Sequence, residues 1–274
     1  MSPRAALVAN SIELGLVFAG LALLWPLVFS REARARLAAI RPALAPWDAP
    51  LSGFLLFLWL IVCCGMIAQF AAAALFRPLA LSEDGGLIAA NAALEFGMLA
   101  GIAAYRFGFG TDRTPLVFAP AKVLVSGIGT FLVAMPVVVA VGLVWQFLLK
   151  TCGLPIEQQD MIGRLANAES PTLLVAMIVL ATVTAPIAEE LIFRAGFFRY
   201  LRTRLPRWAA LLAPACLFGA LHQNLATFAP LVALGIVFSL AYERTGRIGT
   251  SIVAHGLFNA HTIALIFIDP SAAN

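Results

Sequence analysis

The sequence predicts an all-α, polytopic membrane protein of about eight transmembrane helices, with both termini outside. Of its 274 residues, 62% are hydrophobic and only 12% are charged, whereas a soluble globular chain carries roughly 25% charged residues. The apolar residues form long continuous runs and not the alternating segments of about ten residues that are typical of outer-membrane barrels. The arginines and lysines fall on alternate sides of these runs. Together these observations exclude a soluble domain and favour a helical bundle in a bilayer.

Eight apolar runs are candidates for membrane spans. The first is too long for the core of a signal peptide and is expected to be a retained helix. Two of the last three contain only about fifteen residues, or roughly 22 Å of helix, so they must extend into their flanks or border a thinned, water-filled cavity. The runs cover residues 5–29, 51–76, 85–105, 121–149, 171 to about 198, 208–222, 228–242 and 248–268.

The placement of the basic residues predicts the orientation. If the N-terminus lies outside, the inner segments hold fourteen of the eighteen lysines and arginines, and the outer segments hold only Arg4, Arg77, Lys150 and Arg164. Inner segments of membrane proteins carry such an excess. The net charge of +4 is therefore explained by topology and by the lipid bilayer as partner, without nucleic acid. We expect a multi-pass protein of the cell membrane.

A polar break at residues 150–170 divides the chain. It separates an N-terminal four-helix portion, residues 1–150, from a C-terminal four-helix portion, residues 171–268. The four cysteines form no C-x-x-C pair, which argues against a disulfide scaffold or a cysteine-rich metal site.

Ionisable residues gather in the apolar runs of the C-terminal portion. A charged side chain at the centre of a membrane span costs at least about 2.5 to 3.5 kcal/mol, so these residues are candidates for function. Glu190 and Arg194 lie one turn apart and are expected to form an ion pair, which leaves Glu189 free to face the bundle interior. Phe218 with His222, and His255 with Asn259, are also four residues apart, so each pair shares one helix face.

Three helices can thus direct a carboxylate, two imidazoles and a carboxamide at one point. Such a set suits hydrolysis: Glu189 with His222 can orient and deprotonate a water, while His255 and Asn259 donate hydrogen bonds to an oxyanion. Counting along the helices places the site between the midplane and the arginine-rich inner face. We therefore expect a cavity that opens toward the cytoplasm.

These residues resemble the signature of a known family, the type II CAAX prenyl endopeptidases and bacteriocin-processing enzymes of the abortive-infection or CPBP family. Its motifs are E-E-x-x-x-R, F-x-x-x-H and H-x-x-x-N. This chain matches all three in order, over roughly its C-terminal third, with Glu189-Glu190-x-x-x-Arg194, Phe218-x-x-x-His222 and His255-x-x-x-Asn259.

The resemblance implies an intramembrane endopeptidase with a C-terminal catalytic core of CAAX-protease type. It makes Glu189, His222, His255 and Asn259 the catalytic residues, with Glu190, Arg194 and Phe218 in support. Members in eukaryotes remove the last three residues of prenylated proteins. For this chain we expect only a membrane-associated peptide or protein, lipidated or leader-bearing, cleaved near the cytoplasmic face.

Three alternatives remain open. Glu189, His222 and His255 could form a His₂Glu zinc shell, although no H-E-x-x-H is present and a metal-free mechanism is favoured. A catalytically silent immunity or interaction protein of the same family would keep the motifs. A transporter could use the cluster as an ion site, although the paired, broken helices of transporter repeats are missing.

Other polar residues in the spans are not expected to take part in catalysis. Glu95 lies beside Gly97 and Gly101, a G-x-x-x-G pattern that predicts a close helix crossing, with Glu95 bonded locally. Glu13 lies near the outer end of the first run. His261 follows His255 by six residues, about 240° of rotation around a helix, and is expected to point away from the site.

Overall fold

The computed structural model describes residues 3–39, 43–79, 82–109, 120–156, 163–165 and 170–268. All regular elements in these residues are helical, and seven helices are long and apolar enough to cross a membrane. The predicted class, an all-α polytopic membrane protein, is confirmed.

The N-terminal half contains four of these long helices. Its elements are α1 (Pro3–Phe29), α2 (Arg31–Ala39), α3 (Leu51–Phe76), η1 (Arg77–Leu79), α4 (Glu83–Ala104), the π-helical turn η2 (Tyr105–Phe109) and α5 (Pro120–Thr151). α4 begins where the Ser82 hydroxyl accepts a hydrogen bond from the Gly85 backbone N–H, and acidic residues occupy its first turn, where the helix dipole favours negative charge.

The C-terminal half is built around one long rod, residues 171–202. α7 (Pro171–Val179), the π-helical turn η3 (Leu180–Thr184), α8 (Ala185–Glu190), the π-helical turn η4 (Leu191–Phe198) and α9 (Arg199–Arg202) follow one another without a break. Three further helices complete the fold: α10 (Arg207–Leu221), α11 (Leu225–Thr245) and α12 (Ile248–Ile268).

The two short apolar runs behave differently. α11 extends beyond its apolar run to 21 residues, whereas α10 contains only 15 residues and is not one of the seven long helices. α10 ends at His222 because Gln223 takes a left-handed backbone conformation, with φ of 51°, and Asn224 then caps α11 through the Thr227 backbone N–H. The expected eighth span is therefore a shorter helix.

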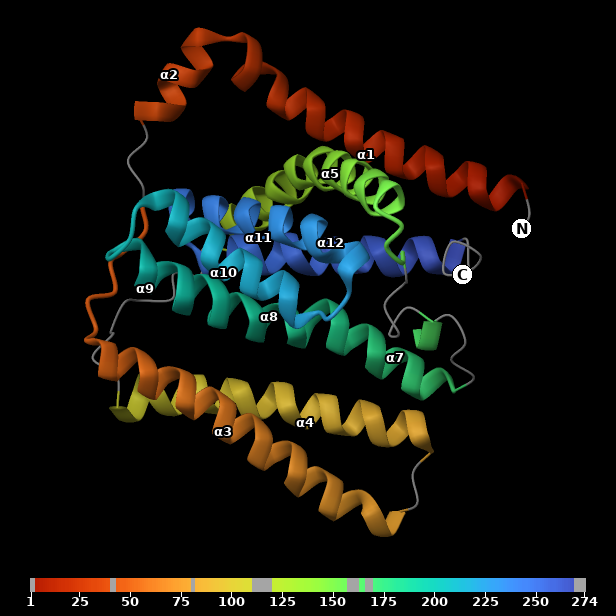
Figure 1. Cartoon of the computed structure of the whole chain (residues 1–274), viewed down its shortest axis with the longest axis vertical. Helices are drawn as coiled ribbons and strands as arrows, with labels where there is room; N and C mark the ends of the chain where they lie inside the picture. The colour runs from red at the N-terminus through yellow and green to blue at the C-terminus, as the bar shows by residue number, and fades with distance from the viewer. Residues whose placement is uncertain are drawn as a thin grey trace.

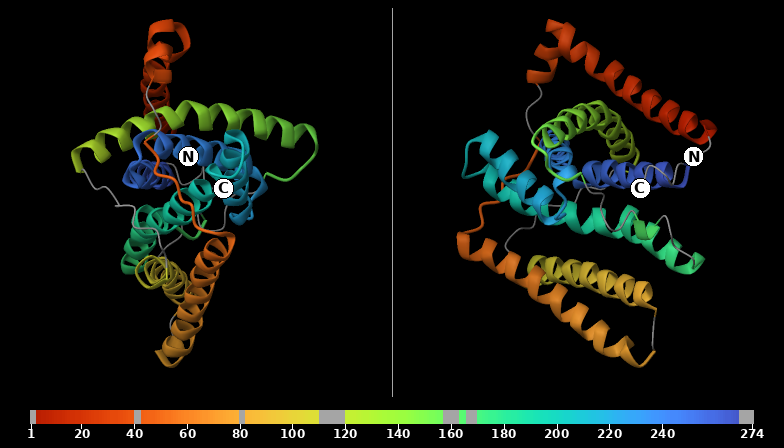
Figure 2. Two further views of the ribbon diagram at one scale, coloured as in Figure 1. Left: turned by 90° about the vertical axis from the view of Figure 1, so that its left-hand side faces the viewer. Right: turned by 45° about the vertical axis from the view of Figure 1, so that its right-hand side comes forward.

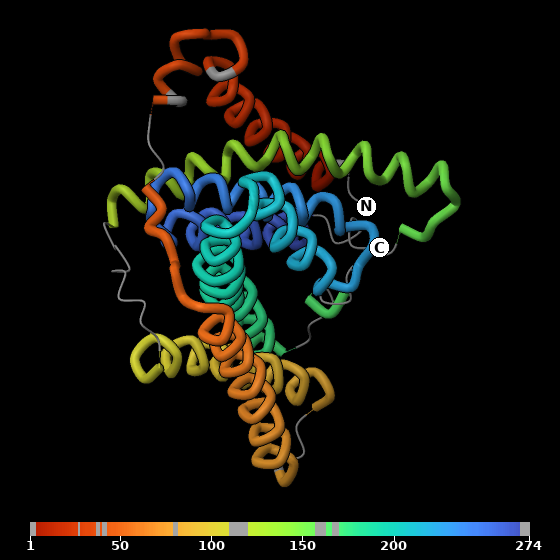
Figure 3. Tube along the Cα trace, turned by 60° about the vertical axis from the view of Figure 1, so that its left-hand side comes forward, coloured from red at the N-terminus to blue at the C-terminus, as the bar shows by residue number. Residues whose placement is uncertain are grey.

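The helices lie in layers (Figure 1). α1 is outermost and packs on α5, which in turn packs over α11 and α12. The hairpin of α3 and α4 lies on the opposite side of the rod, as the turned views also show (Figures 2 and 3). The division into portions 1–150 and 171–268 stays a prediction. The four long N-terminal helices form two pairs, α1 with α5 and α3 with α4, which lie on opposite sides of the rod. The polar residues Glu157, Asp160 and Glu169 of the break lie outside the described residues.

One end of the molecule is rich in arginine, and an extended segment, residues 43–50, crosses it. Arg199 donates hydrogen bonds to the carbonyls of Ala45 and Pro46, and Arg204 donates to those of Trp47 and Ala49. The two described ends of the chain lie at the opposite end (Figure 1). Arg199 and Arg204, two of the arginines that predict the inner face, thus lie together at this end, while the orientation in the membrane stays a prediction.

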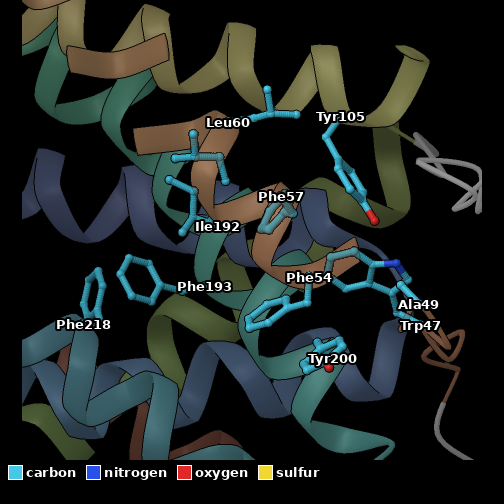
Figure 4. Packing of buried hydrophobic residues seen from close by; sticks show 11 residues of the cluster. Trp47, Ala49, Phe54, Phe57, Leu60, Tyr105, Ile192, Phe193, Tyr200 and Phe218 are labelled. Atoms are coloured by element: carbon cyan, nitrogen blue, oxygen red, sulfur yellow. The ribbon is translucent and has the colours of Figure 1, made fainter. Parts of the chain in front are cut away.

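An aromatic cluster joins the hairpin to the rod at this end (Figure 4). Trp47 contacts Phe54, Phe57, Tyr105 and Tyr200 with ring centroids 5.3 to 6.0 Å apart. Since lipid tails are as apolar as these rings, helix association in a bilayer depends on close van der Waals packing. The cluster provides such packing.

The predicted close helix crossing is confirmed between α3 and α4. A Cβ at Gly97 would lie 2.5 Å from the Cys64 carbonyl oxygen, and one at Gly101 would lie 2.5 Å from that of Leu60. Only glycine fits this approach, so the G-x-x-x-G face of α4 is turned toward α3.

Candidate active site

The rod has an irregular backbone just before Glu189. The Ala185 N–H bonds to the Leu180 carbonyl, five residues back, and Pro186 has no N–H to donate. The Ala181 carbonyl is consequently left for a side chain, and the Asn259 amide nitrogen donates to it at 2.7 Å. Asn259 thus fastens α12 to the rod beside Glu189, and its second N–H remains for another acceptor.

Glu190 and Arg194 form the predicted ion pair, and both side chains are fully buried. The Arg194 Nη1 to Glu190 Oε1 distance is 2.6 Å, and their side chains are 1% and 0% exposed. The guanidinium also lies over the rings of Phe218 and Phe238, 4.7 and 5.4 Å from their centroids. Cation–π contacts of this kind are strongest where water is excluded.

Glu190 also orients His255. The Nδ1 atom of His255 lies 2.9 Å from Glu190 Oε1, and because a carboxylate only accepts, Nδ1 is the donor. The opposite ring atom, Nε2, faces Glu189 Oε2 at 3.6 Å. This distance is too long for a direct hydrogen bond, but it leaves the two groups on opposite sides of a small gap. Sequence reasoning assigned Glu190 only to Arg194 and missed this second contact.

His222 is fixed in a similar manner. Its Nδ1 lies 2.8 Å from the Phe218 carbonyl oxygen, which can only accept, so Nδ1 carries the proton and Nε2 of the neutral ring is an acceptor. The Phe218 ring packs edge-on against both imidazoles, with centroids 4.8 Å from His222 and 5.9 Å from His255. Phe218 therefore spaces the two histidines.

The four residues predicted to converge do so. Glu189, His222, His255 and Asn259 line one cavity of about 310 Å³. Of the two adjacent glutamates, Glu189 keeps 27% of its side chain exposed while Glu190 is buried completely. The rest of the wall is mainly apolar and includes Val138, Leu165, Met177, Leu231, Phe258, Ile263 and Ile266.

The cavity extends away from the arginine-rich end, whereas the depths counted along the helices predicted that it opens toward that end. Which end faces the cytoplasm stays a prediction. The wall of the cavity runs along α12 from His255 to Ile266 and includes Leu165 and Thr227, away from the arginines. The reason is that His222 lies at the far end of α10 and Asn259 lies one turn beyond His255. A second cavity of about 430 Å³ lies at the arginine-rich end and is lined by none of the four residues.

Among the residues that the structure describes, no group of three His, Cys, Asp or Glu side chains is found that could hold a metal ion. Glu189, His222 and His255 line one cavity, and both the zinc alternative and the metal-free mechanism stay predictions.

His261 is absent from the lining of the cavity that holds Glu189 and His255, as expected. Its ring lies 6.1 Å from that of Phe131 on α5. Glu95 differs from expectation, because its Oε2 is buried and has no hydrogen-bond partner among the described residues.

Comparison with known proteins gives a family for the C-terminal part. Residues 171–261 match the family model described as type II CAAX prenyl endopeptidase Rce1-like. The chain is 33% identical over 89 residues to "Putative membrane peptidase YdiL" of Bacillus subtilis (strain 168), which covers 32% of this chain and 36% of that protein.

Two further relatives have names without a stated activity. Identity is 32% over 90 residues to the UPF0177 protein YbdI of Lactococcus lactis subsp. lactis (strain IL1403), covering 32% of this chain and 47% of that protein. It is 32% over 143 residues to an uncharacterized 24.3 kDa protein of Escherichia coli, covering 50% and 63%. The matches thus span about a third to two thirds of the relatives' lengths. No solved structure matches the chain.

Proposed function

Because residues 171–261 match the family model of the Rce1-like type II CAAX prenyl endopeptidases, we propose that this membrane protein is an intramembrane endopeptidase in which Glu189 activates water. The observation that carries the proposal is the convergence of Glu189, His222, His255 and Asn259 on one cavity. Glu189 is the acid that faces this cavity, while Glu190 is enclosed with Arg194.

The mechanism that we propose is metal-free. Glu189 takes a proton from water as the water oxygen bonds to the peptide carbonyl carbon, and it returns that proton to the amide nitrogen as the C–N bond breaks. Water has two O–H groups, so one is directed at Glu189 and the Nε2 atom of either His222 or His255 accepts a hydrogen bond from the other. The free N–H of Asn259 donates to the oxyanion.

This distribution differs from the roles expected from sequence. His255 was expected to donate to the oxyanion, but its Nδ1 proton is directed at Glu190. In the neutral ring Nε2 then has no proton to donate. We therefore propose Asn259 as the oxyanion donor and His255 as a second group that holds the water.

The substrate proposed is a membrane-associated peptide or protein. The apolar wall of the cavity suits a hydrophobic segment, and the cavity lies in the half of the molecule away from the arginine-rich end. With the arginines at the cytoplasmic face of the cell membrane, cleavage takes place in the outer half of the bilayer.

Glu189→Gln tests the proposal, since it removes the base and keeps the shape of the side chain. Membrane proteins from cells with either chain are compared by mass spectrometry, and truncated products are expected only with the wild-type carboxylate. Glu13→Gln is the matched control and should leave the products unchanged. If the cellular phenotype survives Glu189→Gln, the protein is a binder; flux into vesicles without a peptide product identifies a transporter.

A chelator tests the metal-free mechanism. Proteolysis by the purified protein is expected to continue after treatment with a chelator and dialysis. Loss of activity that zinc alone restores would contradict it.

A further inference from the structure

Glu95 lies on the face of α4 that is turned toward the rod. Gly97 and Gly101 contact the backbone of α3, and Glu95 precedes Gly97 by two residues, or about 200° around the helix. The Glu95 side chain is therefore directed away from α3, and α4 packs on that other side against α7, η3 and α8.

Neighbours on the same face place Glu95 opposite the catalytic stretch. Ile88, two turns earlier, packs with Met177 near the start of the rod. Leu99, one turn later, shares the wall of the second cavity with Leu191, just past Glu190. Glu95 lies between these two contacts, and its carboxyl group interacts electrostatically with Glu189.

The carboxyl group of Glu95 has a buried oxygen, Oε2, that makes no hydrogen bond within the described part of the chain. An unpaired charge inside a membrane is costly, and two carboxyl groups that interact through a low dielectric do not both ionise readily. A helix-packing role would be served better by an apolar residue.

We propose that Glu95 is a positioning residue of the peptidase site, holding a proton opposite Glu189 so that the two carboxyl groups together carry one negative charge. This rests on the proposed function, and it extends the site beyond residues 171–261 to a helix of the N-terminal half. The single charge leaves Glu189 as the base and avoids a second negative charge beside the oxyanion.

The pH dependence of proteolysis tests this role. Two coupled carboxyl groups titrate in two steps that belong to the pair. Wild-type kcat should rise with the first ionisation and fall with the second, which removes the Glu95 proton. Glu95→Gln should lose the alkaline fall with KM changed less than twofold, whereas Glu95→Asp should keep both limbs. Glu13→Gln, the control, should match wild type. A Glu95→Gln profile that superimposes on wild type would overturn the proposal.

Infrared spectroscopy provides a test without catalysis, so it separates this proposal from that of the peptidase. The carbonyl stretch of a buried, neutral carboxyl group is expected in the wild-type protein and in the inactive Glu189→Gln variant, and the Glu95→Gln variant should lack it. Retention of the band in Glu95→Gln with loss in Glu189→Gln would assign the proton to Glu189 and overturn the proposal.

Discussion

At the scale of single residues, the site depends on one enclosed charge pair. Glu190 accepts hydrogen bonds from both Arg194 and His255, so the same carboxylate neutralises a buried cation and sets the direction of an imidazole. The carboxylate that we propose as the catalytic base is the neighbouring Glu189. Adjacent glutamates thus have different tasks because successive helical positions face different directions.

Replacement of Arg194 should show how much this enclosure matters. Arg194→Met leaves Glu190 buried without its cation, and breaking a buried pair in this way destabilises a protein by about 3–5 kcal/mol. Thermal unfolding in detergent should show the loss, and the double variant Glu190→Gln with Arg194→Met should recover much of it. Equal stability of Arg194→Met and wild type would contradict the account.

Activity should separate the orienting role of Glu190 from its structural one. In a second double variant, Glu190→Met with Arg194→Met, His255 loses the acceptor that fixes its ring, because methionine has no carbonyl oxygen to accept from Nδ1. We expect kcat to fall by about 10- to 100-fold, the range seen when outer-shell partners of a functional histidine are removed, with a small change in KM. Full activity in a stably folded double variant would show that Glu190 has no orienting role.

At the scale of elements, the long apolar runs predicted most helices, but they did not predict the irregular turns. The long apolar runs became helices with nearly the expected bounds, because a bilayer allows few alternatives to a helix. The π-helical turns η3 and η4 were not predicted. Pro186, three residues before Glu189, was the available signal, since it removes a backbone donor within the rod.

The contact between α12 and the rod can be tested at Gly256. A Cβ there would lie 2.6 Å from the Thr182 carbonyl oxygen, so Gly256→Ala must push the two helices apart. Overpacking of this kind typically costs about 1–3 kcal/mol, and activity should fall with it. Gly129→Ala is the control, because nothing lies within 4 Å of its added Cβ. Equal melting temperatures for the two variants would contradict the close approach.

The site was easier to predict than its surroundings. Positions four apart on a helix predicted the pairs Glu190–Arg194, Phe218–His222 and His255–Asn259, and all line or support the cavity. The predicted direction of the cavity relative to the arginine-rich end was wrong. Depths counted along separate helices do not show which side chains close the cavity at that end. The contribution of Glu95 could not be predicted, since it depends on how α4 packs against a helix distant in sequence.

At the scale of the whole molecule, the arginines and the cavity lie toward opposite ends. Arg202 and Arg207 both pair with the buried Glu243, and Arg199 and Arg204 hold the segment 43–50, so these residues stabilise the fold at the end that also predicts topology. The cavity lined by Glu189, His222, His255 and Asn259 extends toward the other end.

Orientation can be measured with a membrane-impermeant maleimide in whole cells. Cys152, which is exposed at the end of α5, should react in intact cells when the other cysteines are replaced. In a cysteine-free chain, Thr203→Cys at the arginine-rich end should react only after permeabilisation. The reverse pattern would place the cavity in the cytoplasmic half and contradict the predicted topology.

The most direct test of the central claim is hydrolysis in ¹⁸O-labelled water. Membranes from cells that contain the wild-type or the Glu189→Gln chain are incubated in this water, and new peptide carboxyl termini are identified by mass spectrometry. The account predicts termini that carry one ¹⁸O atom in wild-type membranes and are missing with Glu189→Gln. Labelled termini in equal amounts from both chains would show that the Glu189 carboxylate does not activate water for peptide cleavage.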